Sequence, residues 1–335
     1  MYDNLNLIII CVTLILSLIF FLNLKFISQK LKIFDIPDKK LKIHKNKVFL
    51  GGGVIFFIIT TFIFFSEIFF FETEFFFLEG LKRKFVFFFG LSCIFILGIF
   101  DDKYNLSYKN KFIYLILIIY ICISLDNNLL INNLNFKTLD YLIRLENFNL
   151  FFTCICFLIF INALNLFDGL NLQSGTYILT IFFCFIFVLK QNYFIYYIPS
   201  FFLFLIFNYK TKIFLGNSGS LFFGFLISYF AIKFYNFNYI SIEEIFLIML
   251  IPGIDMLRLF FTRITKTKNP FSGDRNHIHH ILSNKLNDTL SFIIIQINII
   301  GPLISHYYFK LSINLSILFG ILFYLLLILK FKKNS

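Results

Sequence analysis

The chain has 335 residues, 59% of them hydrophobic and only 14% charged, and its formal net charge is +12. Soluble domains are about half apolar and about a quarter charged, so this composition excludes a soluble protein and predicts an all-α chain that crosses a membrane many times. Such a positive charge is typical of loops on the cytoplasmic side of a membrane, and we expect no nucleic acid partner. The six cysteines lie in apolar runs without a Cys-x-x-Cys pattern, which favours packing over disulfides or a metal site.

Eleven apolar segments are long enough, or nearly so, to cross a membrane, for which a helix needs about 20 residues. We expect about eleven transmembrane helices in one integral-membrane domain that covers residues 1–335. The first segment lacks a basic region and a small-residue cleavage site, so we interpret it as a retained span. The segments are 6–25, 50–71, 84–100, 112–131, 148–165, 175–190, 193–208, 219–235, 243–262, 289–308 and 311–329.

The distribution of Lys and Arg predicts the orientation. Alternate loops and the C-terminal tail carry 21 of the 30 basic residues, the other loops carry seven, and Lys233 and Arg258 lie within spans. Because basic residues gather on the cytoplasmic side, we expect the N-terminus outside and the C-terminus in the cytoplasm. The run Lys82-Arg83-Lys84 falls on the predicted outer side, against this rule.

The first predicted cytoplasmic loop, 25–49, contains eight lysines. These lysines would either anchor the chain to anionic lipid or form an approach surface for a polyanionic substrate. His44 is the lone histidine among them, and Gly51-Gly52-Gly53 follows the loop. A glycine run permits close packing of the backbone, for structural or functional reasons.

The second loop begins with two adjacent carboxylates, Asp101 and Asp102, and ends near Lys111. Negative charge at the C-terminal end of a helix opposes the helix dipole, so a solvated helix end explains this pair poorly. Hard cations such as Mg²⁺ take carboxylate oxygens and bridge to substrate phosphates. The pair therefore favours metal or phosphate chemistry.

The third loop follows a span that ends with Asn162, Asn165 and Asp168, spaced three residues apart. On a helix these positions share one face. Two amides and a carboxylate at the end of an apolar span are costly without partners, and they exceed what a helix cap needs. Gly169 is predicted to end this helix and open a turn.

The fourth loop runs into an apolar span through Gly216-Asn217-Ser218-Gly219-Ser220. Small residues there would expose backbone N–H groups to a phosphate, or Ser218 or Ser220 would form an ordinary helix cap. Both interpretations stay open at this point.

The fifth loop gathers Arg275, His277, His279 and His280. A zinc site is a weak interpretation, because no matching Cys or Glu follows at a suitable spacing. A cluster that contacts a diphosphate is favoured, since the Arg guanidinium fits phosphate with two hydrogen bonds.

These motifs together resemble the polyprenyl-phosphate hexosamine-1-phosphate transferases of glycosyltransferase family 4. Its relatives include the phospho-MurNAc-pentapeptide translocase. The resemblance covers about residues 35–282. The family's Asp-x-Pro, Lys-x-x-His and Gly-Gly pattern is similar to 35–52, with an irregular gap before His44. Its Gly-x-x-Asp-Asp, Leu and Lys pattern is similar to 98–111. The Asn-Ala-x-Asn-x-x-Asp-Gly motif is intact at 162–169, and Asp-Arg-x-His-x-His-His is intact at 274–280.

Two positions depart from the family pattern. Where the family has Phe-x-Gly-Asp-x-Gly-Ser, this chain has Asn217 in place of the aspartate. Where the family has Asp-Gly-Leu-Asp-Gly-Leu, this chain has Asn171 in place of the second aspartate. The resemblance implies that position 217 is a metal ligand. Because an amide offers one neutral oxygen, we expect weaker metal affinity there.

The resemblance implies transfer of a sugar 1-phosphate, of the N-acetylhexosamine type, from a UDP-sugar to undecaprenyl phosphate, with release of UMP at the cytoplasmic face. It implies Mg²⁺, with Mn²⁺ as an alternative, held by Asn217 with help from Asp101, Asp102 or Asn165. One acid, Asp101 or Asp168, would orient or deprotonate the lipid phosphate. Substrate contacts are expected from His44, Lys111, Asn162, Arg275, His277, His279 and His280.

The same resemblance implies a multi-pass protein of a bacterial inner (plasma) membrane, in the first step of a lipid-linked cell-envelope glycan pathway. A homodimer is left open. A different class is also open, namely a catalytically silent relative or a membrane scaffold that binds lipid or sugar nucleotide. A transporter is disfavoured, because its polar groups would lie near the bilayer midplane and not at the ends of spans.

Overall fold

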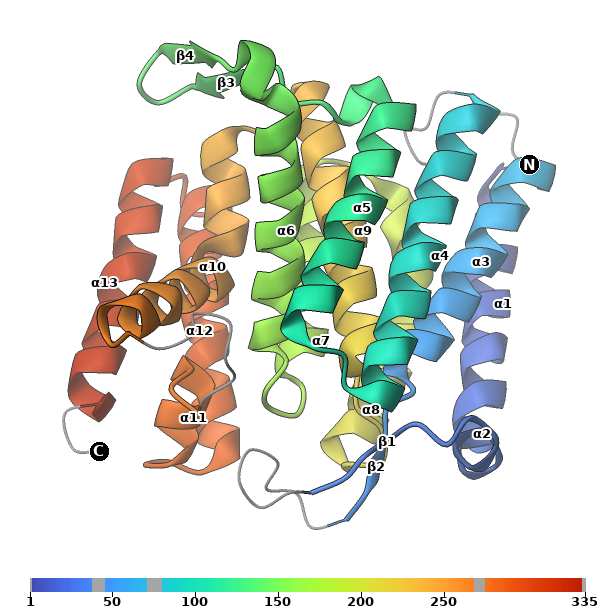
Figure 1. Cartoon of the computed structure of the whole chain (residues 1–335). Helices are drawn as coiled ribbons and strands as arrows, with labels where there is room; N and C mark the ends of the chain where they lie inside the picture. The colour runs from blue at the N-terminus through green and yellow to red at the C-terminus, as the bar shows by residue number, and fades with distance from the viewer. Residues whose placement is uncertain (1, 38–45, 71–79, 268–274, 333–335) are drawn as a thin grey trace.

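The computed structural model describes residues 2–37, 46–70, 80–267 and 275–332, and these residues form a bundle of helices that run side by side (Figure 1). Nine helices in this part of the chain are long and apolar enough to cross a membrane. They are α1 (Tyr2–Leu22), α3 (Gly52–Phe70), α4 (Leu81–Tyr104), α5 (Tyr108–Leu125), α6 (Asn149–Phe167), α9 (Gly216–Asn236), α10 (Ile242–Thr265), α12 (Asp288–Tyr307) and α13 (Ile313–Lys332).

The other two predicted spans are shorter helices. One is α7 (Gln173–Phe183), which continues as a π-helical turn, and the other is α8 (Ile198–Tyr209), which a 3₁₀ turn precedes. The described residues also contain two short α-helices, α2 (Leu24–Leu31) and α11 (Ile278–Ser283), and two 3₁₀ turns at Asn127–Leu129 and Glu146–Phe148. The all-α polytopic prediction is confirmed, whereas eleven crossings and the orientation of the termini stay predictions.

Two short antiparallel hairpins, which the sequence analysis does not predict, lie at opposite ends of the bundle (Figure 1). In the first, β1 (Phe34–Asp35) pairs with β2 (Val48–Phe49). In the second, β3 (Asn133–Phe136) pairs with β4 (Tyr141–Arg144). Strands of two to four residues lack the extended alternation that reveals a strand in a sequence.

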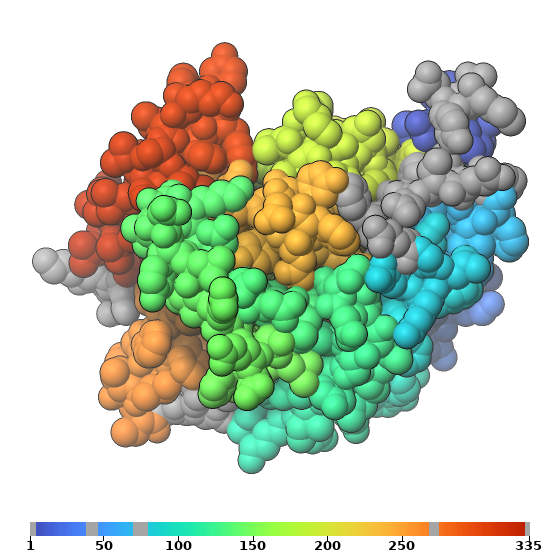
Figure 2. Space-filling view, turned by 90° about the horizontal axis from the view of Figure 1, so that it is seen from above, coloured from blue at the N-terminus to red at the C-terminus, as the bar shows by residue number. Residues whose placement is uncertain are grey.

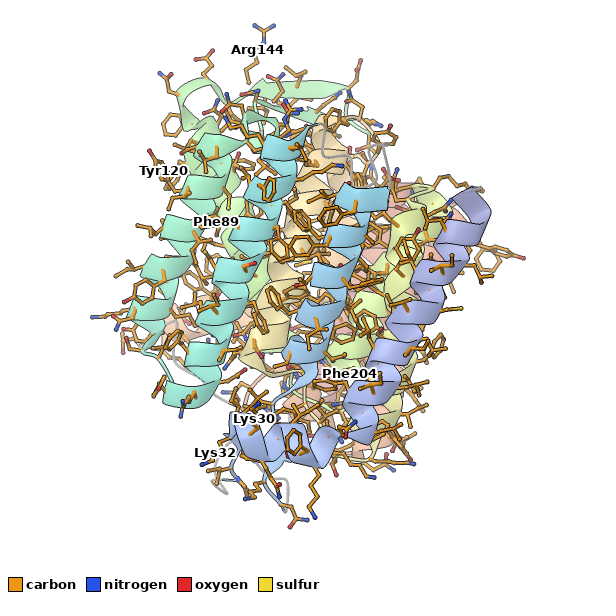
Figure 3. All side chains as sticks on the ribbon, turned by 90° about the vertical axis from the view of Figure 1, so that its right-hand side faces the viewer. Lys30, Lys32, Phe89, Tyr120, Arg144 and Phe204 are labelled. Carbon is orange, nitrogen blue, oxygen red and sulfur yellow. The ribbon has the colours of Figure 1, made fainter. Side chains whose placement is uncertain are left out.

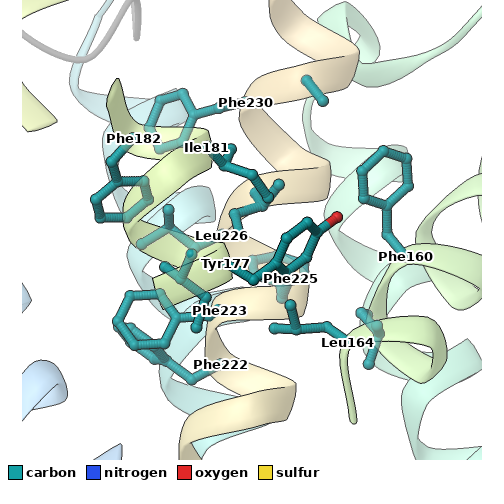
Figure 4. Packing of buried hydrophobic residues seen from close by; sticks show 14 of the residues in the cluster. Phe160, Leu164, Tyr177, Ile181, Phe182, Phe222, Phe223, Phe225, Leu226 and Phe230 are labelled. Atoms are coloured by element: carbon teal, nitrogen blue, oxygen red, sulfur yellow. The ribbon is translucent and has the colours of Figure 1, made fainter. Parts of the chain in front are cut away.

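Helix α9 is the central element, and 94% of its spanning window is buried inside the protein. Its Phe222, Phe223 and Phe225 pack among the side chains of α6 and α7 (Figure 4). Glycines let neighbouring helices approach closely. A Cβ on Gly98 of α4 would lie 2.4 Å from the Ser218 Cα, and one on Gly224 would lie 2.7 Å from the Ile161 Cα. The apolar core thereby fixes α4, α6 and α9 against one another.

Helix α10 bends along its length (Figure 1), and Pro252 lies inside this helix. Proline has no N–H, so the carbonyl four residues earlier loses its helical partner. That carbonyl belongs to Ile248, and the buried Tyr177 hydroxyl of α7 donates a hydrogen bond of 3.0 Å to it. Tyr177 therefore supports the bend, beyond which α10 continues toward the fifth loop.

Ion pairs account for Arg83 and Lys84 of the basic run that contradicts the orientation rule, whereas Lys82 is exposed. Lys84 forms a 2.9 Å ion pair with Glu67, and Arg83 lies 3.6 Å from the Asp126 carboxylate. Lys233, in the last turn of the buried helix α9, lies 2.9 Å from the same carboxylate. Lys84 and Lys233 are therefore neutralised inside the protein, and we expect them to contribute little to the loop charge that sets the orientation.

Candidate active site

The predicted polar motifs converge at one end of the bundle, the end that carries β1, β2 and α11 (lower end of Figure 1). Helices α4 and α6 end there, and α5 and α9 begin there. An antiparallel arrangement of neighbouring helices thus joins motifs that lie more than a hundred residues apart in the sequence.

Asp102 caps the N-terminus of α9. Its Oδ1 accepts a 2.7 Å hydrogen bond from the Asn217 backbone N–H, and its Oδ2 accepts a 2.9 Å bond from that of Ser218. Gly216 has φ of +73°, and a Cβ there would lie 2.8 Å from the Asp102 Oδ2. The cap is therefore a carboxylate from α4, so a serine cap is the wrong interpretation. These two N–H groups are already engaged and are not open to a phosphate.

Asp101 belongs to a second chain of polar contacts. Its Oδ2 accepts a 2.8 Å hydrogen bond from the Lys111 Nζ, which also lies 3.3 Å from the Asn165 Oδ1. The Asn165 Nδ2 in turn donates to the Asn217 Oδ1 at 2.8 Å and to the Ser220 Oγ at 2.7 Å. This network connects α4, α5, α6 and α9, and it brings together polar residues that were predicted to lie on one side of the membrane.

Asn162 is the exception within its motif. Its Nδ2 donates a 2.7 Å hydrogen bond to the Leu158 carbonyl of its own helix, one turn earlier. In the part of the chain that the structure describes, no hydrogen bond joins it to the network around Asn165. Its predicted contact with substrate stays a prediction.

Asp168 ends α6 and faces the start of α7. Its Oδ1 accepts a 2.5 Å hydrogen bond from the Ser174 hydroxyl. The pKa of Asp168 is raised from 3.8 to about 6, mainly by burial and also by the nearby charges of Asp102 and Asp35, while the Ser174 hydrogen bond acts in the opposite direction. Asp35 lies in β1, so the first loop also contributes to this end of the bundle.

His279 packs directly against the turn that follows Asp168. A Cβ on Gly169 would lie only 1.9 Å from the His279 Nε2, so this position needs glycine to admit the imidazole. The ring of His277 stacks nearly parallel to that of His279, 5.5 Å away, and His280 is also in ring contact with His279. Burial lowers the pKa of His279 well below its ordinary value of 6.5, and charged neighbours including Arg275 add to the effect. His279 is therefore neutral at physiological pH.

Asp255, a site residue that was not predicted from the sequence, organises the fifth loop. This buried carboxylate accepts a 2.8 Å hydrogen bond from the His277 Nδ1 and another from the Ile278 N–H at 3.2 Å. Arg258 and the Tyr324 hydroxyl each donate to it at 2.8 Å. Ionisable residues three apart inside an apolar span are a functional signal, and Asp255 with Arg258 shows that pattern.

The glycine run packs as the sequence predicts. The Gly52 N–H donates to the Phe214 carbonyl and the Gly53 N–H to the Leu215 carbonyl, both at 3.0 Å. A Cβ on Gly53 would lie 2.4 Å from the Gly219 nitrogen. His44 lies outside the described residues, so the structure does not test its predicted role.

The donor set fits a hard cation that shares its coordination with substrate. Among the residues that the structure describes, no three His, Cys, Asp or Glu side chains lie close enough together to hold a metal ion. Asn165 and Asn217 each have a side-chain oxygen that accepts one hydrogen bond, which leaves one lone pair on each. Mg²⁺ commonly binds through one or two carboxylates, several waters and substrate phosphates, and such a site needs no third acid.

Known proteins match this chain over most of its length. The model of glycosyl transferase family 4 matches residues 84–235, from the start of α4 to the end of α9. The undecaprenyl-phosphate alpha-N-acetylglucosaminyl 1-phosphate transferase of Thermotoga maritima is 27% identical over 287 residues, 82% of each chain. The protein of Bacillus subtilis named "probable undecaprenyl-phosphate N-acetylglucosaminyl 1-phosphate transferase" is 27% identical over 298 residues, 85% of this chain and 80% of its own.

An Escherichia coli undecaprenyl-phosphate alpha-N-acetylglucosaminyl 1-phosphate transferase is 32% identical over 75 residues, 22% of this chain and 20% of its own. The family match includes Asp101, Asp102, Lys111, Asn165 and Asn217, which the structure joins at one end of the bundle. The motifs, the fold and these matches agree. This chain is similar to glycosyl transferase family 4 over the segment from α4 to α9, and the names of its relatives indicate an enzyme of the sugar-1-phosphate transferase type.

Proposed function

We propose that this enzyme transfers an N-acetylhexosamine 1-phosphate from a UDP-sugar to undecaprenyl phosphate. An oxygen of the lipid phosphate forms a bond to the sugar-bearing phosphorus of the donor, and the bond from that phosphorus to UMP breaks. The products are undecaprenyl-diphospho-sugar and UMP. The names of the relatives that cover most of the chain support this substrate pair. We further propose that residues 1–335 form one domain.

The observation that carries the proposal is the polar network at the end of an otherwise apolar bundle. It joins Asp101, Lys111, Asn165 and Asn217 by hydrogen bonds, and Asp102 caps the same helix. Phosphoryl transfer depends on positioning and on neutralising charge. A lipid phosphate at a membrane surface and a soluble nucleotide meet most readily at such an end of the spans.

Asp168 is the acid that we propose to accept the proton of the lipid phosphate. A general base works best when its pKa lies near the working pH, and the pKa of about 6 of Asp168 meets this condition. Asp101 is less suited, because Lys111 and the Leu106 N–H already engage both of its oxygens. Asp101 would instead hold Lys111 in place beside the phosphates.

The family is of a kind that uses a divalent metal ion, and we propose Mg²⁺, with Mn²⁺ as the alternative. When bound, it would neutralise the phosphate oxygens, held by Asn217 with the nearby Asp102 carboxylate and the Asn165 amide. Arg275, His277 and His280 are proposed to contact the diphosphate or the uridine. The buried and neutral His279 would donate or accept a hydrogen bond without adding charge.

We propose that this end of the bundle faces the cytoplasm of a bacterial plasma membrane. Lys30 and Lys32 lie at this end, on and just after α2, whereas Arg144 lies at the other (Figure 3). The excess of basic residues in the loops of this side supports the orientation. Whether the enzyme forms a homodimer stays a prediction.

The test is UMP release by purified full-length protein given undecaprenyl phosphate, Mg²⁺ and a panel of UDP-N-acetylhexosamines. We expect release with one donor, loss of release in Asp168→Asn, and normal release in Asp288→Asn, which changes an exposed acid at the start of α12. No release with any donor, from protein that still binds UDP-sugar, would instead support a silent relative. In that case, turnover restored by Asn217→Asp would locate the defect.

A further inference from the structure

A polar pocket lies at the end of the bundle opposite the candidate active site. Its volume is about 420 Å³, which is within the range of small-molecule sites. Figure 2 looks onto this end, where the segment that includes β3 and β4 (green) lies beside the segment that follows α9 (light orange). The pocket, here called the asparagine pocket, is lined by Asn127, Asn128, Leu130, Asn132, Asn133, Asn135, Leu142, Tyr235, Asn236, Phe237 and Asn238.

The lining of the asparagine pocket is polar but uncharged. Seven of its eleven residues are asparagines, and none is acidic or basic. The charged groups beside the pocket are paired with each other: the Asp126 carboxylate lies 2.9 Å from the buried Lys233 and 3.6 Å from the partly exposed Arg83. A phosphate or a carboxylate would need unpaired cations, and a metal ion would need carboxylates. The lining therefore favours a neutral ligand.

Hydrogen bonds to the backbone hold the walls of the pocket together. The Tyr235 hydroxyl accepts a 2.9 Å bond from the Asn135 N–H and donates a 2.7 Å bond to the Asn133 carbonyl. The Asn236 Nδ2 donates to the Asn128 carbonyl at 2.8 Å and to the Leu130 carbonyl at 3.2 Å. The end of α9 is thereby fixed to the 127–132 turn and to β3, so the pocket is formed before any ligand arrives.

Four of the lining amides are available to a ligand. Within the residues that the structure describes, the side chains of Asn127, Asn133, Asn135 and Asn238 make no hydrogen bond to the protein. Each amide offers two N–H donors and one carbonyl acceptor, which matches hydroxyl groups that both donate and accept. Tyr235 and Phe237 add aromatic side chains to the lining.

We propose that the asparagine pocket binds a neutral carbohydrate of one or two sugar rings. The proposal follows from the shape, polarity and lack of charge of the pocket, and it does not depend on the reaction at the other end. On the predicted orientation the pocket faces the outside of the cell, where such a ligand meets it without crossing the membrane.

Calorimetric titration of the full-length protein in nanodiscs tests the proposal, with N-acetylglucosamine, diacetylchitobiose, glucose and maltose as probes. The double variant Asn133→Ala/Asn135→Ala removes two amides whose side chains lack protein partners. Leu142→Trp instead fills the pocket while keeping every amide, since Leu142 pairs with Asn135 across the hairpin. Asn147→Ala, an exposed asparagine outside the pocket, is the matched control.

We expect saturable binding of at least one probe, weakened about tenfold or more in both pocket variants and changed less than about twofold in the control. Melting temperatures within a few degrees of the original establish that the variants are folded. Absence of binding by all four sugars overturns the proposal. Equal binding by the original protein and by the folded double variant overturns it as well, because the sugar would then lie elsewhere.

Discussion

Variants of Asp255 and Arg258 should distinguish two effects of the Asp255 carboxylate, its contribution to stability and its positioning of His277 for catalysis. Asp255 is 2% exposed and accepts hydrogen bonds from His277, Arg258 and Tyr324. The variant Asp255→Leu leaves the Arg258 charge without its carboxylate, in a position where that side chain is only 15% exposed. Breaking a buried ion pair from one side costs about 3–5 kcal/mol, so we expect a markedly lower melting temperature.

The double variant Asp255→Leu/Arg258→Leu removes both charges together. Because neither charge is then left uncompensated, we expect it to regain most of the stability that the single variant loses. The His277 Nδ1 still lacks its acceptor, so its ring is no longer held beside His279. The rate of UMP release should therefore stay at least about tenfold below that of the original enzyme. Loss of a hydrogen bond that orients a histidine has an effect of this size in metal sites.

Thermal unfolding and UMP release, measured on the same preparations, check this pair of expectations. A double variant with full activity would refute the idea that Asp255 positions His277. A single Asp255→Leu variant as stable as the original would refute the importance of the buried ion pair. Asp288→Leu, at an exposed acid, controls for the loss of a carboxylate as such.

Three further predictions follow from the site and its supports. The kcat/KM for transfer should rise about tenfold per pH unit below pH 6 and level off above it. The reason is that burial raises the pKa of Asp168 to about 6 and the reaction needs the ionised carboxylate. A profile that is flat from pH 5 to 7 would contradict this role. Gly169→Ala should reduce kcat/KM by at least about tenfold, because the added Cβ would clash with the His279 ring. Gly253→Ala should leave kcat/KM unchanged, because a Cβ at that position meets no neighbouring atom within 4 Å. Tyr177→Phe should lower the melting temperature by an amount equivalent to about 1–3 kcal/mol, because the Ile248 carbonyl loses its donor, and unaltered unfolding would show that the bend of α10 needs no such support.

The membrane character, the helical class and the grouping of motifs follow from the sequence because each depends on local composition or on loop charge. Asp101, Lys111, Asn165 and Asn217 are polar residues at the ends of apolar spans, a pattern that is visible without a structure. The partners of these residues are not visible in this way. That Asp102 caps α9, 115 residues further along the chain, depends on how α4 and α9 pack, which local patterns do not specify.

Asp255 was not predicted as a site residue for a related reason. It lies within an apolar span, and only the bend at Pro252 and the fold of the fifth loop bring it to His277. The partners of Lys233 and Lys84 are likewise not visible in the sequence. Each appears costly in a span when it is considered alone, and each is paired with an acid from another segment in the folded protein. Buried charges thus reveal that a partner exists, but they do not identify it.

The replacement of the family aspartate by Asn217 has a physical explanation in this network. The Asn217 backbone N–H already bonds to the Asp102 carboxylate, and the Asn217 side-chain oxygen accepts from Asn165. An aspartate there would add a further negative charge to a network that already holds Asp101 and Asp102 and whose described cation is Lys111, so it would favour a bound cation. With asparagine the network is satisfied without that cation. On the metal-ligand role that we propose for Asn217, the enzyme should therefore hold a divalent ion less tightly and depend more on the substrate phosphates to complete its coordination.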